Sequence, residues 1–130
     1  MQFSGFRTAL GKASSKQSGD AAEDIALRHL QQAGLRLLVR NYRTPGRGGG
    51  EIDLIMREVD GTTVFVEVRA QRAGGHGGAA ASISAVKRRR IVFAARHYLA
   101  RCAVQPPCRF DVIAFDAGVL RWLKAAFDAG

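Results

Sequence analysis

The spacing of apolar residues predicts a helix near the start of the chain. Between Asp20 and Ala33, apolar side chains recur every three or four residues along one helical face, and Gly34 follows as a left-handed stop. Residues 1–19 instead mix Gly, Ser and Lys, without the continuous apolar segment of a secretory signal. We therefore expect a flexible N-terminal arm over 1–19, a single folded domain over 20–130, and a cytoplasmic location.

A second helical pattern begins after Ser84, whose hydroxyl suits the N-cap position. Apolar residues repeat at helical spacing from Ile91 to Cys102, and the sequence Gln105-Pro106-Pro107 ends the helix. Lys87 lies four residues before Ile91, so it projects from the buried stripe of this helix one turn earlier.

Short apolar runs bounded by Gly and Pro predict strands. A flexible Gly-rich loop over 44–50 follows the first strand, and Val119–Leu123 fits either a short strand or a helix. The strand, helix, strand order in the second half predicts two parallel strands joined by a crossover. The expected fold is therefore α/β: a helix, a three-strand meander, a helix and a strand, with helices on both faces of a mixed sheet. The expected strands are Leu35–Tyr42, Glu51–Glu58, Thr62–Arg69 and Arg109–Phe115.

The hairpin between the second and third strands has a register that can be argued from its side chains. A two-residue turn at Asp60-Gly61 would mix polar and apolar side chains on both faces, whereas a three-residue loop with a left-handed Gly61 sorts them. In this second register Asp53 lies opposite Glu67, with side chains about 5 Å apart. The other face is then wholly apolar, with Ile52, Leu54, Met56, Val64, Val66 and Val68.

The opposed carboxylates of Asp53 and Glu67 point to a metal site. They repel each other unless a positive charge lies between them, and hard oxygen ligands suit Mg²⁺ or Mn²⁺. Such an ion can polarise a phosphoryl oxygen and lower the pKa of a bound water, which is the chemistry of phosphodiester hydrolysis. Arg69 alternates with Glu67 along its strand, so its cation shares this face and could bind the phosphate. Alternatively, both acids pair with Arg69 and Arg57 in a surface ladder.

The charge balance favours a polyanionic partner. The chain carries 20 Lys and Arg against 11 Asp and Glu, a formal net charge of +9, so nucleic acid, and DNA in particular, is the expected partner. A membrane partner is not expected, because no apolar stretch approaches the ~20 residues that cross a bilayer. Cys102 and Cys108 have neither zinc-site spacing nor a disulfide framework, so free thiols are expected.

Three blocks carry a family resemblance: Gly50–Ile55, Phe65–Arg69 and Arg109–Ile113. They resemble the YraN-like family of uncharacterised bacterial proteins, with a match from about residue 19 to 127. Within the PD-(D/E)xK nuclease superfamily this family is similar to archaeal Holliday junction resolvases, which act as dimers. The resemblance implies a restriction-endonuclease-like core and a Mg²⁺- or Mn²⁺-dependent endonuclease, with a homodimer as one form it could take. It also implies three metal ligands, which are Glu23, Asp53 and Glu67.

The last motif position departs from the superfamily pattern, because Arg69 stands where Lys is usual. Arginine stays protonated, so it can stabilise negative charge on a phosphate but cannot take a proton from water. Lys87 could orient the water instead, as could Gln71, which lies one further alternation along the strand. Members of the resembling family carry either Lys or Arg here, so the change does not by itself indicate an inactive protein.

Basic side chains in two Gly-rich loops and at the start of the second helix are expected to contact backbone phosphates. Like charges at a helix N-terminus oppose the helix dipole, and phosphate contacts would offset that cost; a solvated helix start is the alternative. No aromatic-interleaved surface for stacking single-stranded bases is expected, nor a helix-turn-helix reader. The predicted nucleic-acid-binding residues are Arg43, Arg47, Arg72, Arg88, Arg89 and Arg90.

Three functions remain open on this evidence. The first is a metal-dependent endonuclease acting on DNA, including branched or single-stranded DNA. The second is a catalytically silent nucleic-acid-binding module, and the third is a protein-interaction factor whose basic surface meets an acidic partner. Without the resemblance, Glu23 would be read as an exposed carboxylate favoured near the positive end of its helix.

Overall fold

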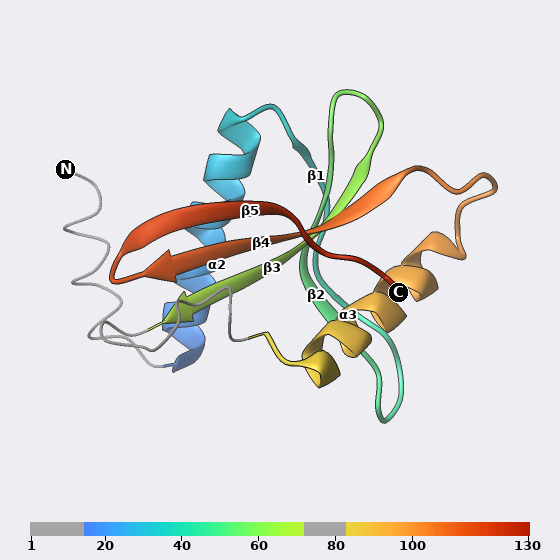
Figure 1. Ribbon diagram of the computed structural model, residues 1–130, viewed down its shortest axis with the longest axis horizontal. Coiled ribbons are helices and arrows are strands. Elements are labelled where there is room, and N and C mark those ends of the chain that lie inside the picture. The colour runs from blue at the N-terminus through green and yellow to red at the C-terminus, as the bar shows by residue number, and fades with distance from the viewer. Residues whose placement is uncertain (1–14, 72–82) are drawn as a thin grey trace.

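The computed structural model describes residues 15–71 and 83–130, which fold into two helices and five strands (Figure 1). The elements are α2 (Ser15–Gln32), β1 (Arg36–Arg43), β2 (Glu51–Arg57), β3 (Thr63–Gln71), α3 (Ala85–Leu99), β4 (Cys108–Asp116) and β5 (Val119–Phe127). The strands form one sheet in chain order; β3 and β4 are parallel, and the other neighbours are antiparallel. The expected α/β fold with a mixed sheet is confirmed, and it fits a restriction-endonuclease-like core.

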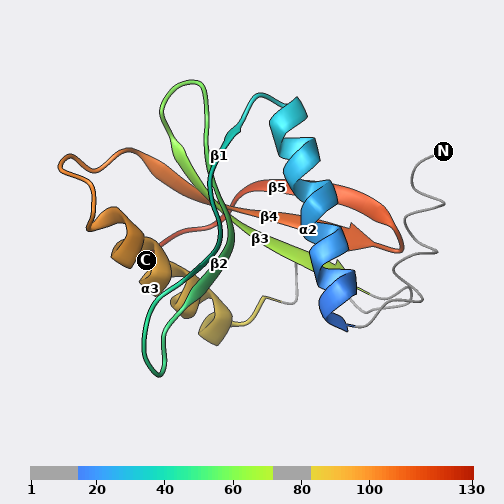
Figure 2. The same ribbon diagram turned by 180° about the vertical axis from the view of Figure 1, so that it is seen from behind.

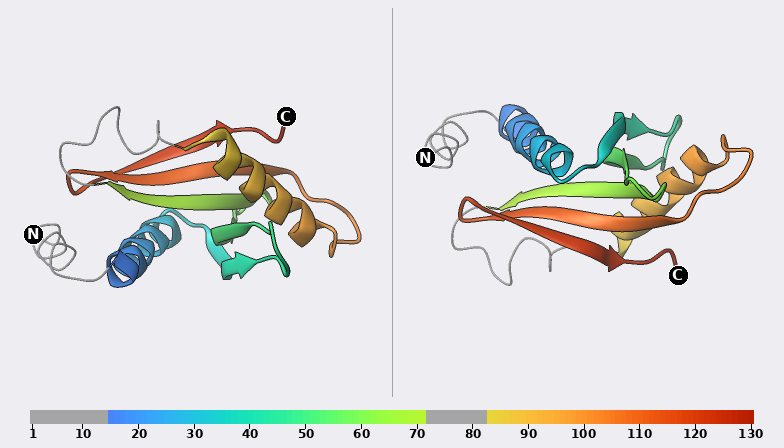
Figure 3. Two further views of the ribbon diagram at one scale, coloured as in Figure 1. Left: turned by 90° about the horizontal axis from the view of Figure 1, so that it is seen from below. Right: turned by 90° about the horizontal axis from the view of Figure 1, so that it is seen from above.

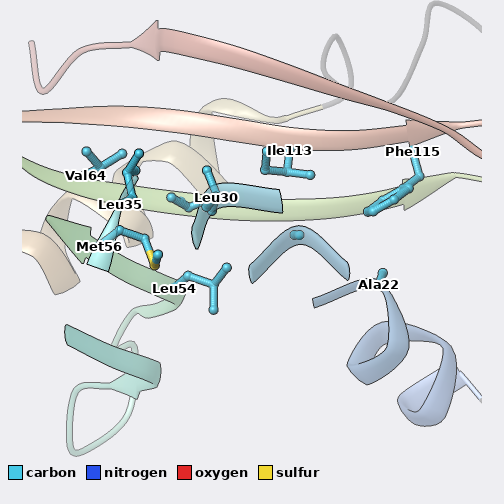
Figure 4. Close-up of a cluster of buried hydrophobic side chains, with 10 residues drawn as sticks. Ala22, Leu30, Leu35, Leu54, Met56, Val64, Ile113 and Phe115 are labelled. Atoms are coloured by element: carbon cyan, nitrogen blue, oxygen red, sulfur yellow. The ribbon is translucent and has the colours of Figure 1, made fainter. Parts of the chain in front are cut away.

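The two helices cover opposite faces of the sheet (Figure 3). From behind, α2 is seen lying across β3, β4 and β5, while the loop between β1 and β2 reaches toward α3 (Figure 2). Each helix buries its own apolar cluster, as expected where a helical stripe meets one face of a sheet. The α2 cluster is Ala22, Ala26, Leu30, Leu35, Leu54, Met56, Val64, Val66, Ile113 and Phe115 (Figure 4). The α3 cluster is Ile52, Ile55, Phe65, Ile91, Val92, Ala94, Ala95, Leu99 and Phe110.

The hairpin of β2 and β3 adopts the register that the side chains predicted. Leu54 pairs with Val66 and Met56 with Val64, and the loop closes through the Glu58 N–H, which donates to the Thr62 carbonyl at 2.9 Å. Gly61 takes φ +94°, a left-handed conformation that favours glycine. The three-residue loop is therefore confirmed.

One residue of that hairpin was assigned to the wrong face. Ile52 was expected on the same face as Leu54, but it packs in the α3 cluster. In the neighbouring strand β1, Asn41 has φ +56°, and asparagine is among the few non-glycine residues that tolerate this region. Asn41 stands between Arg40, the partner of Leu54, and Tyr42, the partner of Ile52, so the change of face coincides with a left-handed residue in β1.

Several predicted boundaries move. α2 begins at Ser15 rather than at Asp20, so residues 15–19, expected in the N-terminal arm, belong to this helix. Ser84 is the N-cap of α3 and accepts a hydrogen bond from the Lys87 N–H at 3.0 Å, as expected, but the helix ends at Leu99. The undecided C-terminal segment is a strand, β5. Both cysteines are free, and no helix within 15–71 or 83–130 is long and apolar enough to span a bilayer.

Asp111 anchors β5 to β4. Its side chain is fully buried and accepts hydrogen bonds from the Trp122 Nε1 and from the Ala125 N–H, both at 2.9 Å. The Arg109 Nε donates to both of its oxygens, at 3.0 and 3.2 Å, and Arg109 also pairs with Glu58. The β4–β5 register shifts between the neighbours of Asp111, so the carboxylate compensates for a break in the ladder.

Candidate functional site

The strands β2 and β3 part at Asp53, and the candidate site lies in this fork. Their ladder runs from Arg57–Thr63 to Leu54–Val66. At the next step the Asp53 Oδ2 accepts a hydrogen bond from the Val68 N–H at 2.8 Å, so a side chain takes the place of a backbone partner. The strands diverge here because the start of β2 is drawn to α3.

Gly50 shows how closely β2 approaches α3. A Cβ atom built on Gly50 would lie 1.9 Å from the Arg90 carbonyl oxygen, a distance that only glycine avoids. The ends of the preceding loop are joined: the Thr44 Oγ1 accepts a hydrogen bond from the Gly50 N–H at 2.7 Å, and the Thr44 N–H donates to the Gly50 carbonyl at 3.0 Å. This closed loop leads into the start of β2, which lies beside Arg90 and Ala94 of α3.

Replacing Gly50 with alanine is therefore expected to lower the free energy of unfolding by about 2 kcal/mol, since a backbone atom blocks the added methyl group. Gly19 is the matched control, because a Cβ there meets nothing within 4 Å and alanine favours the helix. Urea denaturation would compare the two variants. A Gly50→Ala protein as stable as the parent would contradict the close approach of β2 to α3.

Glu67 is the second acid of the fork. Its side chain is 5% exposed, and its Oε2 lies 3.4 Å from the Nζ of Lys87, which extends from the first turn of α3. Burial, together with the charge of Asp53, raises the pKa of Glu67 to about 8. Burial also raises the pKa of Asp53, although the Val68 N–H and a hydrogen bond from Glu67 oppose the rise. The two carboxyl groups therefore share a proton near neutral pH.

Glu23 approaches this pair from α2. Its side chain is 13% exposed, and its pKa is raised first by burial and then by the charge of Asp53. The Arg40 Nε lies 3.3 Å from its Oε1, and the same guanidinium contacts Asp24 at 2.8 Å. Arg40 was not singled out from the sequence, and β1 gives no local signal for it because the strand also carries Arg36 and Arg43.

A groove of about 490 Å³ connects these residues, and the structure brings most of the predicted site together along it. Arg69 lines the groove with the acids and Lys87. Gln71 ends β3, and its side chain lies outside the described residues, as does all of Arg72. The predicted site residues along the groove are Glu23, Asp53, Glu67, Arg69 and Lys87.

Two of the three acids in the groove, Asp53 and Glu67, are suited to bind a hard divalent cation. Among the residues that the structure describes, no three candidate ligands already meet around one point, and Glu23 is held by Arg40. Asp53 and Glu67 do meet, and they are buried oxygen ligands that repel each other when both are ionised. Mg²⁺ commonly binds to one or two carboxylates and takes its remaining ligands from water and phosphate, so this pair suits it.

The four consecutive basic residues of α3 point in different directions. Lys87 lines the groove with the acids and also a second hollow of about 320 Å³, which Arg90 shares with the closed loop and Arg43. Arg88 and Arg89 line a third hollow on the far side of the helix. The run is thus a basic collar around the first turn of α3. Of the other predicted phosphate contacts, Arg47 is exposed in the closed loop.

Comparison with known proteins agrees with the resemblance seen in the sequence. Residues 22–115 match the model of a family described as "Uncharacterised protein family UPF0102". A UPF0102 protein of Albidiferax ferrireducens is 74% identical over 115 residues, covering 88% of this chain and 90% of the relative. One from Paracidovorax citrulli is 65% identical over 122 residues, covering 94% and 90%. With most of its length matched by the family model and by these relatives, the chain belongs to the UPF0102 (YraN-like) family.

Proposed function

We propose that this protein is a Mg²⁺- or Mn²⁺-dependent endonuclease that hydrolyses phosphodiester bonds of DNA in the cytoplasm. The observation that carries the proposal is the buried pair of Asp53 and Glu67 at the fork of β2 and β3, with Lys87 3.4 Å from Glu67. Burying two adjacent acids is costly, and perturbed pKa values, such as the raised pKa values of these two acids, concentrate at functional sites. Their place in a restriction-endonuclease-like core and the formal net charge of +9 support the same conclusion.

In this proposal, some residues of the groove bind the metal ion and others contact the phosphate or the attacking water. Asp53 and Glu67 would hold the cation, and Glu23, which now pairs with Arg40, would be the third ligand. A bound divalent ion would supply a Lewis acid and an activated water. Arg69 neutralises the charge that develops on the phosphate, because its guanidinium stays protonated. Lys87 would orient the attacking water, and Gln71 could assist from the end of β3.

The basic collar and the Gly-rich loops hold the DNA backbone in this proposal. Phosphate contacts position a duplex without reading its sequence, which suits a substrate recognised by its structure. A branched substrate with two-fold symmetry would be cut by a homodimer, with one fork for each strand. The proposed backbone contacts are Arg43, Arg47, Arg72, Arg88, Arg89 and Arg90.

A calorimetric titration with Mn²⁺ tests the site without assuming a substrate. The parent should bind Mn²⁺, and more tightly as the pH rises toward 8, because the ligands must lose their shared proton. Asp53→Asn should abolish binding. Asp60→Asn removes the same charge from an exposed position in the β2–β3 loop, away from the groove, and should bind as the parent does. Equal binding by all three proteins would refute the site.

Cleavage assays with branched, duplex and single-stranded DNA then test the activity. Nicking or cutting that requires Mg²⁺ or Mn²⁺ and disappears in Asp53→Asn and Glu67→Gln is the expected result. DNA affinity that depends on salt but is indifferent to metal and to Glu67→Gln, without cleavage, would instead indicate a binding module. Absence of DNA binding at low salt would leave the protein-interaction function.

A further inference from the structure

The outer face of α3 combines an exposed aromatic ring with arginines. Phe93 is 53% exposed, although it lies in the middle of a helix whose other face is buried. Arg89 lies one turn before it and Arg96 nearly one turn after it, so the three side chains follow one another along the helix surface. The sequence predicted no aromatic-interleaved surface for stacking single-stranded bases, and what the structure adds is one exposed ring between two arginines.

These residues line a groove of about 820 Å³ between α3 and the end of β5. Phe127, which stacks on Phe110 with ring centroids 5.0 Å apart, forms part of the opposite wall. Arg88 also lines the groove, and Asp128 is the one acid among its described lining residues. The groove therefore has an apolar floor edged mainly by fixed positive charge.

An exposed aromatic ring edged by arginines restricts the kind of molecule that can bind in this groove. A second copy of this face would bring arginines against arginines, with one aspartate per copy to offset them. An acidic peptide would match the charge of this groove, but it would not use Lys87 and Arg90, the two residues of the basic collar that line the other hollows. A nucleic-acid strand matches both the arginines and the exposed ring. Its phosphates pair with arginine, and its bases stack on aromatic rings whatever their sequence.

We infer that this groove binds an unpaired stretch of nucleic acid, with one base stacked on the Phe93 ring and the adjoining phosphates held by Arg89 and Arg96. The base must be unpaired because a base inside a duplex offers no free face to the ring. Arg88, which lines the same groove, contacts a further phosphate of the strand.

Basic residues of α3 connect this groove to the fork of β2 and β3. The basic collar runs from Lys87 at the acids to Arg88 and Arg89 at the groove, within one turn of a helix about 10–12 Å across. A few nucleotides of single strand span that distance. The binding claim stands without catalysis; its consequence, that the DNA cut in the fork carries an unpaired segment beside the scissile bond, rests on the proposed function.

Fluorescence anisotropy in EDTA tests the binding claim apart from any cleavage, using a labelled oligothymidylate and a duplex of the same length. Phe93→Leu keeps an apolar side chain but loses the ring, and it should weaken single-strand binding about tenfold while changing duplex binding less than about twofold. Phe93→Trp should restore binding, with fluorescence quenching that the parent lacks. Arg96→Gln should lower the salt dependence of single-strand binding by about one phosphate contact.

Val59→Ser is the matched control, because Val59 is 93% exposed and lies in the β2–β3 loop, where none of the three hollows reaches it. It should bind both DNAs as the parent does. Unchanged single-strand affinity in Phe93→Leu, or an equal loss for both DNAs, would overturn the inference. So would polyglutamate binding that falls in parallel in Phe93→Leu, because the groove would then accept an acidic peptide. None of these results depends on whether Asp53 and Glu67 support cleavage.

Discussion

Asp111→Ala is expected to lower the free energy of unfolding by about 4 kcal/mol, which is the largest effect among the variants considered. The Asp111 carboxylate is fully buried and is the common acceptor for Arg109, Trp122 and the Ala125 backbone. Removing one partner of a buried pair leaves the other charge uncompensated, which typically costs 3–5 kcal/mol. Arg109 would keep Glu58 but lose its buried partner.

Urea denaturation at pH 7 measures this loss, and Asp24→Ala provides the control. Asp24 also pairs with an arginine, but its side chain is 56% exposed, and exposed pairs contribute about 1 kcal/mol or less. Emission from Trp122, the single tryptophan of the chain, should report the release of β5 because its indole donates to Asp111. A loss no larger than that of Asp24→Ala would show that the network does not hold β5.

Glu67→Gln is expected to stabilise the protein by about 3 kcal/mol at pH 8.5 and to have little effect near pH 4.5. The folded-state pKa of Glu67 is raised from its ordinary value of 4.5 to about 8, so the folded protein holds a proton that the unfolded chain has released. Parent stability therefore falls as the pH rises through this window, and the full penalty is present above about pH 8. One pKa unit corresponds to about 1.4 kcal/mol, which puts the ceiling near 5 kcal/mol, and sharing the proton with Asp53 reduces it.

Denaturation of the parent and of Glu67→Gln in EDTA across pH 4.5–8.5 measures the joint contribution of Glu67 and its coupled partner Asp53, because the groups outside this pair titrate alike in both proteins. Glu51→Gln is the control: Glu51 begins the same hairpin, but its side chain is 43% exposed and pairs with Arg43 at 3.6 Å. Its effect should stay within about 0.5 kcal/mol at every pH. A constant difference between the parent and Glu67→Gln over the whole range would contradict the raised pKa.

Much of the fold followed from local pattern. The β2–β3 register could be predicted because sorting six apolar residues onto one face admits only one loop length, and Gly61 is the residue type that loop requires. The N-cap of α3 could be predicted because Ser84 bonds to a backbone N–H only three residues away. The start of α2 could not, because a good capping residue, Asp20, also stands well inside a helix.

Strand pairing in the hairpin was enough to predict the proximity of Asp53 and Glu67. Glu23 was named only through the family resemblance and Lys87 only from its place on the helical stripe, because these two residues come from helices packed on opposite faces. Arg40 was missed because its role depends on which face of β1 meets α2. Phe93 was missed because one phenylalanine among arginines reads as part of a helix, and its exposure depends on the helix's rotation against the sheet.

The sequence by itself determined the order of helices and strands, the hairpin register and the pairing of two acids, because these depend on side-chain periodicity and on contacts between near neighbours. The tertiary structure decided the surroundings of those two acids. The β2–β3 ladder ends at Leu54, and the start of β2 instead approaches α3, where Gly50 lies against Arg90. Asp53 therefore lies in a fork, with its carboxylate on a backbone N–H, rather than in a continuous ladder. Burial in that fork raises the pKa values of both acids, and burial is a property that no short stretch of sequence encodes.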